Sequence, residues 1–190
     1  EEKKGRVPDG DWKREKYDQG WYPGDSVNLS IGQGGLQTTP IQIINMVSGI
    51  ANKGVIYKPS LVDKVLNDQG KVIEDKQPEV KKRLDVDQEA FEILTKGMTE
   101  VTHESYGTAG DVFEDYPIKI AGKTGTAQTG SGGYNHGWFV GFAPASDPEI
   151  AVLVFLENGN SSSHTLPIAR EIFNFYFEID GEEDDDGAGE

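Results

Sequence analysis

The chain has 190 residues, no cysteine and a formal net charge of −15. This length favours a single domain, and the absence of cysteine excludes disulfide bonds and thiolate metal sites. An acidic chain without a stripe of Lys and Arg argues against nucleic acid as a partner, because phosphate binding needs clustered positive charge.

The first 24 residues mix charges with Gly and Pro and contain four aromatic residues, which predicts a loop-rich segment held by aromatic side chains. Residues 39–42, Thr-Pro-Ile-Gln, predict a helix start, with Thr39 as N-cap and Gln42 three residues later. We expect a buried helix from there to about Asn52. The glycine-rich residues 32–35 are expected to form a turn that caps this helix.

Residues 57–80 alternate short apolar pieces with Asn-Asp-Gln-Gly at 67–70, which predicts a small hairpin. A second helix is expected from Asp87 to about Val101. The residues expected on its apolar face are Ala90, Ile93, Leu94, Gly97, Met98 and Val101.

Residues 118–129, 137–142 and 150–156 are expected to be strands, and the apolar run of the last is typical of a strand covered on both faces. Short loops join the strands, so neighbours should pair antiparallel. A helix over 166–177 completes an α/β (α+β) fold, an antiparallel sheet flanked by helices. Its apolar face should contain Ile168, Ile172, Phe173 and Tyr176. We treat 1–179 as one domain and 180–190 as a disordered acidic tail.

Residues 121–127, Ala-Gly-Lys-Thr-Gly-Thr-Ala, place a Lys-Thr-Gly triplet on the first expected strand. Three residues alone occur by chance, and an ordinary strand with an exposed lysine would explain them. With its companions, however, the triplet is one of three elements in serine β-lactamases and penicillin-binding proteins. A strand edge of this kind offers a cation for a substrate carboxylate, hydroxyls to bind it and a backbone N–H for an oxyanion.

Four stretches of the chain, from about Val7 to the last helix, resemble class B penicillin-binding proteins in order and spacing. They are residues 20–34 (Gly-Trp-Tyr-Pro-Gly-Asp-Ser-Val-Asn-Leu-Ser-Ile-Gly-Gln-Gly), 39–42, 120–128 and 136–144. The elongation type, penicillin-binding protein 2, is most similar, and the septal-division type is the nearest alternative. The resemblance implies the serine β-lactamase/penicillin-binding transpeptidase fold. It also implies a D,D-transpeptidase that cross-links peptidoglycan through an acyl-enzyme, with β-lactams as mimics of its D-Ala-D-Ala donor.

The resemblance assigns roles to four residues of the triplet region. Lys123 would hold the substrate carboxylate and tune the neighbouring proton relay. Thr124 and Thr126 would hydrogen-bond the carboxylate, and the Thr126 N–H would complete the oxyanion hole. Gly125 would keep the strand open to close approach of the substrate.

The nucleophile of the family is absent, because no serine among the 190 residues is followed by lysine three positions later. Ser26 and Asn28 match Ser-x-Asn, but this stretch follows the true Ser-x-Asn element in the family, so the match is interpreted as coincidence. We expect the two other catalytic elements upstream of Glu1 and an inactive isolated chain. The alternatives are a non-catalytic β-lactam-sensing or interaction module of the same fold and a serine β-lactamase, which residues 20–34 argue against.

Expected partners are peptidoglycan stem peptides, β-lactams, the N-terminal part of the same protein and the cell-elongation machinery. No apolar run approaches the roughly 20 residues that span a bilayer. Any membrane anchor is therefore expected outside these residues, and the resemblance implies a location on the outer face of the cytoplasmic membrane. No cofactor and no metal are expected: His103, His136 and His164 lack ligand spacing and are interpreted as surface or loop histidines.

Overall fold

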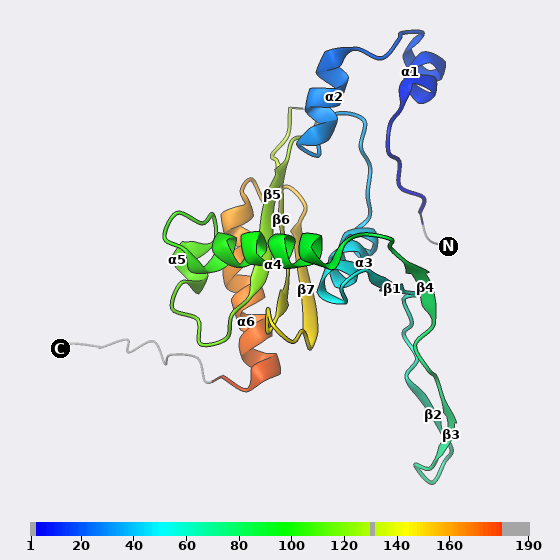
Figure 1. Cartoon of the computed structure of the whole chain (residues 1–190), viewed down its shortest axis with the longest axis vertical. Helices are drawn as coiled ribbons and strands as arrows, with labels where there is room; N and C mark the ends of the chain where they lie inside the picture. Colours follow the sequence, from blue (N-terminus) through cyan, green and yellow to red (C-terminus); the bar gives the residue numbers. More distant parts are fainter. Residues whose placement is uncertain (1–2, 130–131, 180–190) are drawn as a thin grey trace, which may run out of the picture.

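The computed structural model describes residues 3–129 and 132–179 of the chain (Figure 1). Its centre is an antiparallel sheet with the strand order β5-β6-β7, in which β5 is Ala121–Ala127, β6 His136–Ala143 and β7 Ile150–Leu156. The elements around the sheet are α3 (Pro40–Ala51), α4 (Gln88–His103), α5 (Gly110–Phe113), the 3-10 turn η1 (Ser162–Thr165) and α6 (Leu166–Phe177). This arrangement confirms the mixed fold and the antiparallel pairing. The expected acidic tail, 180–190, lies outside the described residues.

The middle strand, β6, contributes to two hydrophobic clusters on opposite faces of the sheet. Phe139 belongs to one cluster, together with Phe113 of α5 and Phe173 of α6. Its neighbour Val140 belongs to the other, together with Val47 of α3. Successive side chains of a strand point to opposite faces, so one strand can anchor both cores. The sheet is therefore held between α5 and α6 on one face and α3 on the other.

The helix α3 begins where the sequence predicts. The Thr39 hydroxyl accepts a hydrogen bond from the Gln42 N–H, and the Gln42 side chain accepts one from the Thr39 N–H. This reciprocal pair satisfies two of the N–H groups that a helix start leaves without partners. Only Val47 and Gly49 of α3 are fully buried, so the helix packs by one face and is not buried all round.

The predicted hairpin is confirmed and is part of a longer arm that extends away from the sheet (Figure 1). At its base β1 (Val55–Tyr57) pairs with β4 (Val80–Arg83), and at its tip β2 (Lys64–Leu66) pairs with β3 (Val72–Asp75). The Asn67 side chain accepts hydrogen bonds from two backbone N–H groups of the tip turn. Asparagine commonly stabilises turns in this way.

The first 24 residues were expected to be loop-rich, and this prediction is wrong. They contain α1 (Gly10–Tyr17) and the start of α2 (Pro23–Ser30). The carboxylate of Asp9 caps α1 by accepting from the Trp12 N–H at 2.8 Å, and Asp25 accepts from the Tyr22 N–H at the start of α2. Neither helix buries a residue, so no apolar stripe marked them in the sequence. Their capping residues were the signal that could have found them.

Two predicted packing faces need correction. In α4, Met98 is buried as predicted, but Ile93, Leu94 and Gly97 are exposed, and the other buried residues are Phe91, Thr102 and His103. In α6, Phe173 is buried as predicted, but Ile168, Ile172 and Tyr176 are exposed, and the helix instead buries Leu166, Ala169 and Asn174. Both buried stripes also have helical spacing, and in α6 the small Ala169 allows close approach. In β7, Val152 and Val154 are fully buried on one face, and Ala151 and Leu153 are half-buried against the α3 cluster on the other, so the strand is covered on both faces as predicted.

The glycine-rich turn at 32–35 belongs to a different helix from the one expected. The N–H of Gly32 donates to the Leu29 carbonyl, and that of Gln33 donates to the Asn28 carbonyl, so the turn closes α2. Gly32 and Gly34 have φ values of 75° and 78°, which L side chains rarely adopt. The following helix α3 is capped by Thr39 instead.

Replacing Gly122 by Ala should destabilise the fold. A Cβ atom at this position would lie 2.8 Å from the Phe139 ring and 2.9 Å from the Thr102 methyl group. Overpacking of this kind typically costs about 1 to 3 kcal/mol of unfolding free energy. Urea unfolding of Gly122→Ala, compared with Gly125→Ala on the same strand, would measure it. The control Cβ would lie 3.5 Å from its nearest neighbour, so equal losses in the two variants would contradict the prediction.

Candidate active site

The Lys-Thr-Gly triplet lies in β5, an edge strand of the sheet (Figure 1). On one side β5 pairs with β6, so that Lys123 lies opposite Val140 and Thr126 opposite Gly137. Among the described strands, none pairs with the other side of β5. A free strand edge can bind an extended peptide through main-chain hydrogen bonds. The triplet is therefore on the one kind of strand that could receive a peptide substrate.

The polar side chains of the triplet region do not share one exposed edge. Lys123 and Thr126 are exposed and Gly125 is half-buried, but Thr124 is buried, at 7% exposure. The roles that the resemblance implies need side chains that a substrate can reach, and Lys123 and Thr126 meet this condition whereas Thr124 does not. Side chains alternate along a strand, so Lys123 and Thr124 point to opposite faces. The Lys123 ammonium group donates to the Thr124 carbonyl oxygen at 2.6 Å.

The two threonine hydroxyls connect β5 to neighbouring segments. The Thr124 hydroxyl lies 2.7 Å from that of Thr108, in the loop between α4 and α5. The Thr126 hydroxyl accepts from the Ser162 N–H at 3.3 Å, at the start of η1. Thr126 is nevertheless exposed. Thr124 is thus engaged within the fold, whereas the Thr126 side chain is accessible to a ligand.

Two residues at the end of α4 that the sequence analysis left outside the site bind the residue just before β5. Thr102 donates to the Ile120 carbonyl at 2.6 Å, and the Nε2 atom of His103 accepts from the Ile120 N–H at 2.9 Å. No periodic or motif signal marks either residue. The interpretation of His103 as a surface or loop histidine is wrong, because its ring is 9% exposed within a helix.

The environment of His103 disfavours its charged form. Burial lowers the pKa of the ring, and the nearby positive charge of Lys119 lowers it further, against smaller opposite effects of the Glu114 carbonyl and the Glu104 carboxylate. His136 lies in β6, and His164 lies in η1. Within the described residues no group of His, Cys, Asp and Glu side chains could hold a metal ion.

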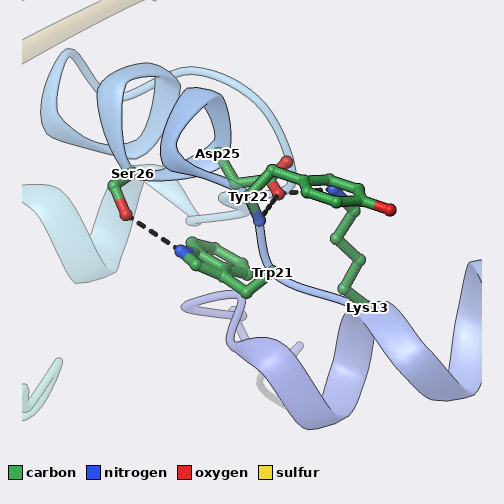
Figure 2. A network of polar contacts seen from close by, with 5 residues as sticks. All are labelled: Lys13, Trp21, Tyr22, Asp25 and Ser26. Carbon is green, nitrogen blue, oxygen red and sulfur yellow. Dashed lines mark hydrogen bonds and ion pairs between the residues drawn. The ribbon is translucent and has the colours of Figure 1, made fainter. Parts of the chain in front are cut away.

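Ser26, the serine of the Ser-x-Asn match, has a structural partner (Figure 2). It lies in α2, and its hydroxyl accepts a hydrogen bond from the Trp21 indole N–H at 2.9 Å. Beside it, Lys13 of α1 forms an ion pair with Asp25 of α2 and lies over the Tyr22 ring. Lys13 therefore joins α1 to the start of α2, and Ser26 binds the segment that leads into α2 (Figure 2).

Comparison with known proteins agrees with this arrangement. The family model "Penicillin binding protein transpeptidase domain" matches residues 2–177. The peptidoglycan D,D-transpeptidase MrdA of Haemophilus influenzae is 32% identical over 93% of this chain and 29% of its own length. A crystal structure of PBP2 from Pseudomonas aeruginosa is 37% identical, with a TM-score of 0.76, 94% of this chain covered and 39% of that chain. PBP2 of Helicobacter pylori, in a complex with MreC, is 29% identical, with a TM-score of 0.73, covering 91% and 31%.

The chain belongs to the penicillin-binding protein transpeptidase family. The resemblance to penicillin-binding protein 2 is confirmed by these relatives. The chain spans about 30% of the length of the curated relatives that it matches first. Across 3–129 and 132–179, no helix has both the length and the apolar character needed to cross a membrane.

The hydroxyl pair of Thr108 and Thr124 should stabilise the fold cooperatively. Thr124→Val leaves the Thr108 hydroxyl without its partner, which should cost about 1 kcal/mol of unfolding free energy. In the double variant Thr108→Val/Thr124→Val, the loss should be smaller than the sum of the single losses by about 0.5 kcal/mol or more. Urea unfolding of the four proteins measures this coupling. Strictly additive losses would show that the two hydroxyls do not interact.

Proposed function

We propose that this chain forms the Lys-Thr-Gly side of the active site of a D,D-transpeptidase that cross-links peptidoglycan in cell-wall synthesis. The observation that carries the proposal is the triplet on a free strand edge, in a chain that belongs to the transpeptidase family. The reaction passes through an acyl-enzyme, and β-lactams bind as mimics of the D-Ala-D-Ala donor. An extended stem peptide would lie along β5.

The exposed side chains of β5 are assigned the substrate contacts. The Lys123 ammonium holds the substrate carboxylate and tunes the proton relay, and the Thr126 hydroxyl hydrogen-bonds the same carboxylate. The Thr126 N–H serves the oxyanion, and Gly125 leaves the strand open to the substrate. Thr124 is assigned a different role from the one the resemblance implied, since its hydroxyl pairs with Thr108. It holds β5 in place.

The nucleophile of the reaction is assigned to sequence outside these 190 residues. No Ser-x-x-Lys motif is present here, and the chain spans about 30% of the length of its relatives. An acyl-enzyme needs an activated serine, and in this family the lysine three residues later belongs to the same catalytic element. The intact enzyme would combine that serine with the β5 edge described here.

The proposed partner besides the stem peptides is the cell-elongation machinery. A PBP2 relative from Helicobacter pylori forms a complex with MreC, which supports this assignment.

We also propose a location on the outer face of the cytoplasmic membrane, where peptidoglycan is assembled. Alkaline phosphatase fused to the complete protein tests the location, because this enzyme folds only after export. Phosphatase activity is expected, and an inactive fusion that accumulates in the cytoplasm would contradict the location.

The isolated chain should form no covalent adduct with a fluorescent penicillin, because it lacks the Ser-x-x-Lys nucleophile. Intact mass spectrometry of the chain after incubation would detect an adduct at any serine, and its presence would refute the proposal.

In the complete protein, one adduct is expected. There Lys123→Ala should slow acylation by about 100-fold or more, since it removes an electrostatic contact to the reacting ligand. The exposed Lys96 of α4 provides the matched control, and Lys96→Ala should leave the rate unchanged.

A further inference from the structure

Both backbone polar atoms of Ile120 are bound by two consecutive side chains of α4. The Thr102 hydroxyl donates to the Ile120 carbonyl at 2.6 Å and shares its proton with a longer contact of 2.9 Å to the Thr99 carbonyl of its own helix. The His103 Nε2 accepts from the Ile120 N–H at 2.9 Å. Thr102 and Ile120 are fully buried, and His103 is 9% exposed. Ile120 comes immediately before β5 and three residues before Lys123. Because Ile120 is buried, water cannot replace these two partners. Without them, its N–H and its carbonyl would have no hydrogen bond.

The contacts of His103 fix its protonation state. Since Nε2 accepts a hydrogen bond, it carries no proton, and the ring is neutral with its proton on Nδ1. The Nδ1 atom that carries this proton lies 3.4 Å from the Glu114 carbonyl oxygen. A second proton, on Nε2, would point at the Ile120 N–H, and two N–H donors cannot form a hydrogen bond with each other. The hydrogen bond to Ile120 therefore exists only while His103 is neutral.

Two further contacts extend this attachment along the same face of β5. The Thr102 methyl group lies 2.9 Å from the position that a Cβ atom on Gly122 would take, so it packs against the bare backbone of that residue. The Thr124 hydroxyl then pairs with Thr108, five residues beyond the end of α4. Residues 120, 122 and 124 alternate with Lys123, whose side chain points to the opposite face. The end of α4 thus fixes the backbone from which Lys123 projects.

We propose that Thr102 and His103 are positioning residues for the Lys-Thr-Gly strand, and that protonation of His103 releases the Ile120 N–H and loosens β5. The link to the reaction rests on the proposed function, whereas the attachment of β5 to α4 does not. The charges that act on His103 are Lys119, which precedes Ile120, and Glu104, which ends α4. Of these, Lys119 opposes protonation and Glu104 favours it.

The direction of the pH effect follows from the neutral state of the ring. The pKa of His103 in the fold lies below its ordinary value of 6.5. The unfolded chain therefore binds this proton first as the pH falls, and the folded form loses stability below about pH 6.5. The attachment is complete at neutral pH. It is lost when the pH falls through the pKa that the ring has in the fold.

NMR spectroscopy of the 190-residue chain between pH 8 and pH 5 tests the inference without any need for catalysis. At pH 8 the His103 ring should be the Nδ1–H tautomer, and the Ile120 amide should be protected from hydrogen exchange. As His103 protonates, the protection factor of Ile120 should fall about tenfold or more, and the amides of 123–126 should follow. Protonation of His103 without a change at Ile120, or an Nε2–H tautomer, would overturn the proposal.

Two pairs of variants separate positioning from general packing. His103→Gln keeps an acceptor that does not titrate, so Ile120 should stay protected at both pH values, whereas His103→Leu should lose protection at both. Thr102→Val should lower protection along β5 and Thr102→Ser should restore it. The matched control is Thr99→Val, since the Thr99 hydroxyl bonds only within its own helix, to the Thr95 carbonyl. Equal pH dependence in wild type and His103→Gln would refute the role of His103, and the wild-type titration decides if a variant fails to fold.

The role in the reaction has its own measurement. In the complete protein, as the pH falls through the pKa of His103 in the fold, penicillin acylation by wild type should fall more steeply than acylation by His103→Gln. Identical pH profiles would remove the positioning role in catalysis. A complete protein that forms no penicillin adduct at any pH would instead overturn the proposed function, while the NMR result would still decide whether His103 holds β5.

Discussion

The fold depends on burying both faces of β6 at once. Phe139 and Val140 are adjacent in the chain, but they lie in separate hydrophobic clusters, one against α5 and α6 and one against α3. Complete burial of each large apolar side chain contributes about 1.5 to 3 kcal/mol. The most deeply buried strand, β6, is central, and β5 and β7 are at the edges.

The position of β5 sets two opposite demands on its residues. Under the proposed function its backbone must stay free on one side to bind a peptide, so a further strand cannot hold it there. Its inward face is held by side chains instead, through Thr102 and His103 at Ile120 and through Thr108 at Thr124. Because side chains alternate along a strand, Lys123 points to the other face, where it is exposed. Attachment by side chains thus leaves one edge of the site strand open, which a second neighbouring strand would not.

The sequence was sufficient for most elements of the fold because their signals are local. The Thr39 cap and the apolar run of 150–156 predicted α3 and β7, and the short connections predicted the antiparallel sheet. The helices α1 and α2 were missed because they bury nothing, so they lack an apolar period. The predicted buried faces of α4 and α6 were wrong because each helix has more than one set of residues at helical spacing. Only tertiary contacts decide between such stripes.

Some features of the candidate site could likewise be predicted from the sequence, and others could not. The exposure of Lys123 and Thr126 on β5 could be predicted from the motif, because it depends only on positions along one strand. The roles of Thr102, His103 and Thr124 could not, because they depend on contacts between segments that are 16 to 18 residues apart in the chain. A buried hydroxyl or imidazole is conspicuous only once its partner is known.

The burial of His103 also links the stability of the fold to the geometry of the site. Its hydrogen bond to Ile120 contributes to folding only in the neutral state, and the same bond fixes the backbone that carries Lys123. A hydrophobic residue at position 103 would fill similar space without any titration, but it would leave the Ile120 N–H without a partner. A permanently charged residue would be costly to bury. Of the residue types that fit a buried helix end, a neutral histidine satisfies the N–H while remaining sensitive to pH, so stability and the placement of β5 change together.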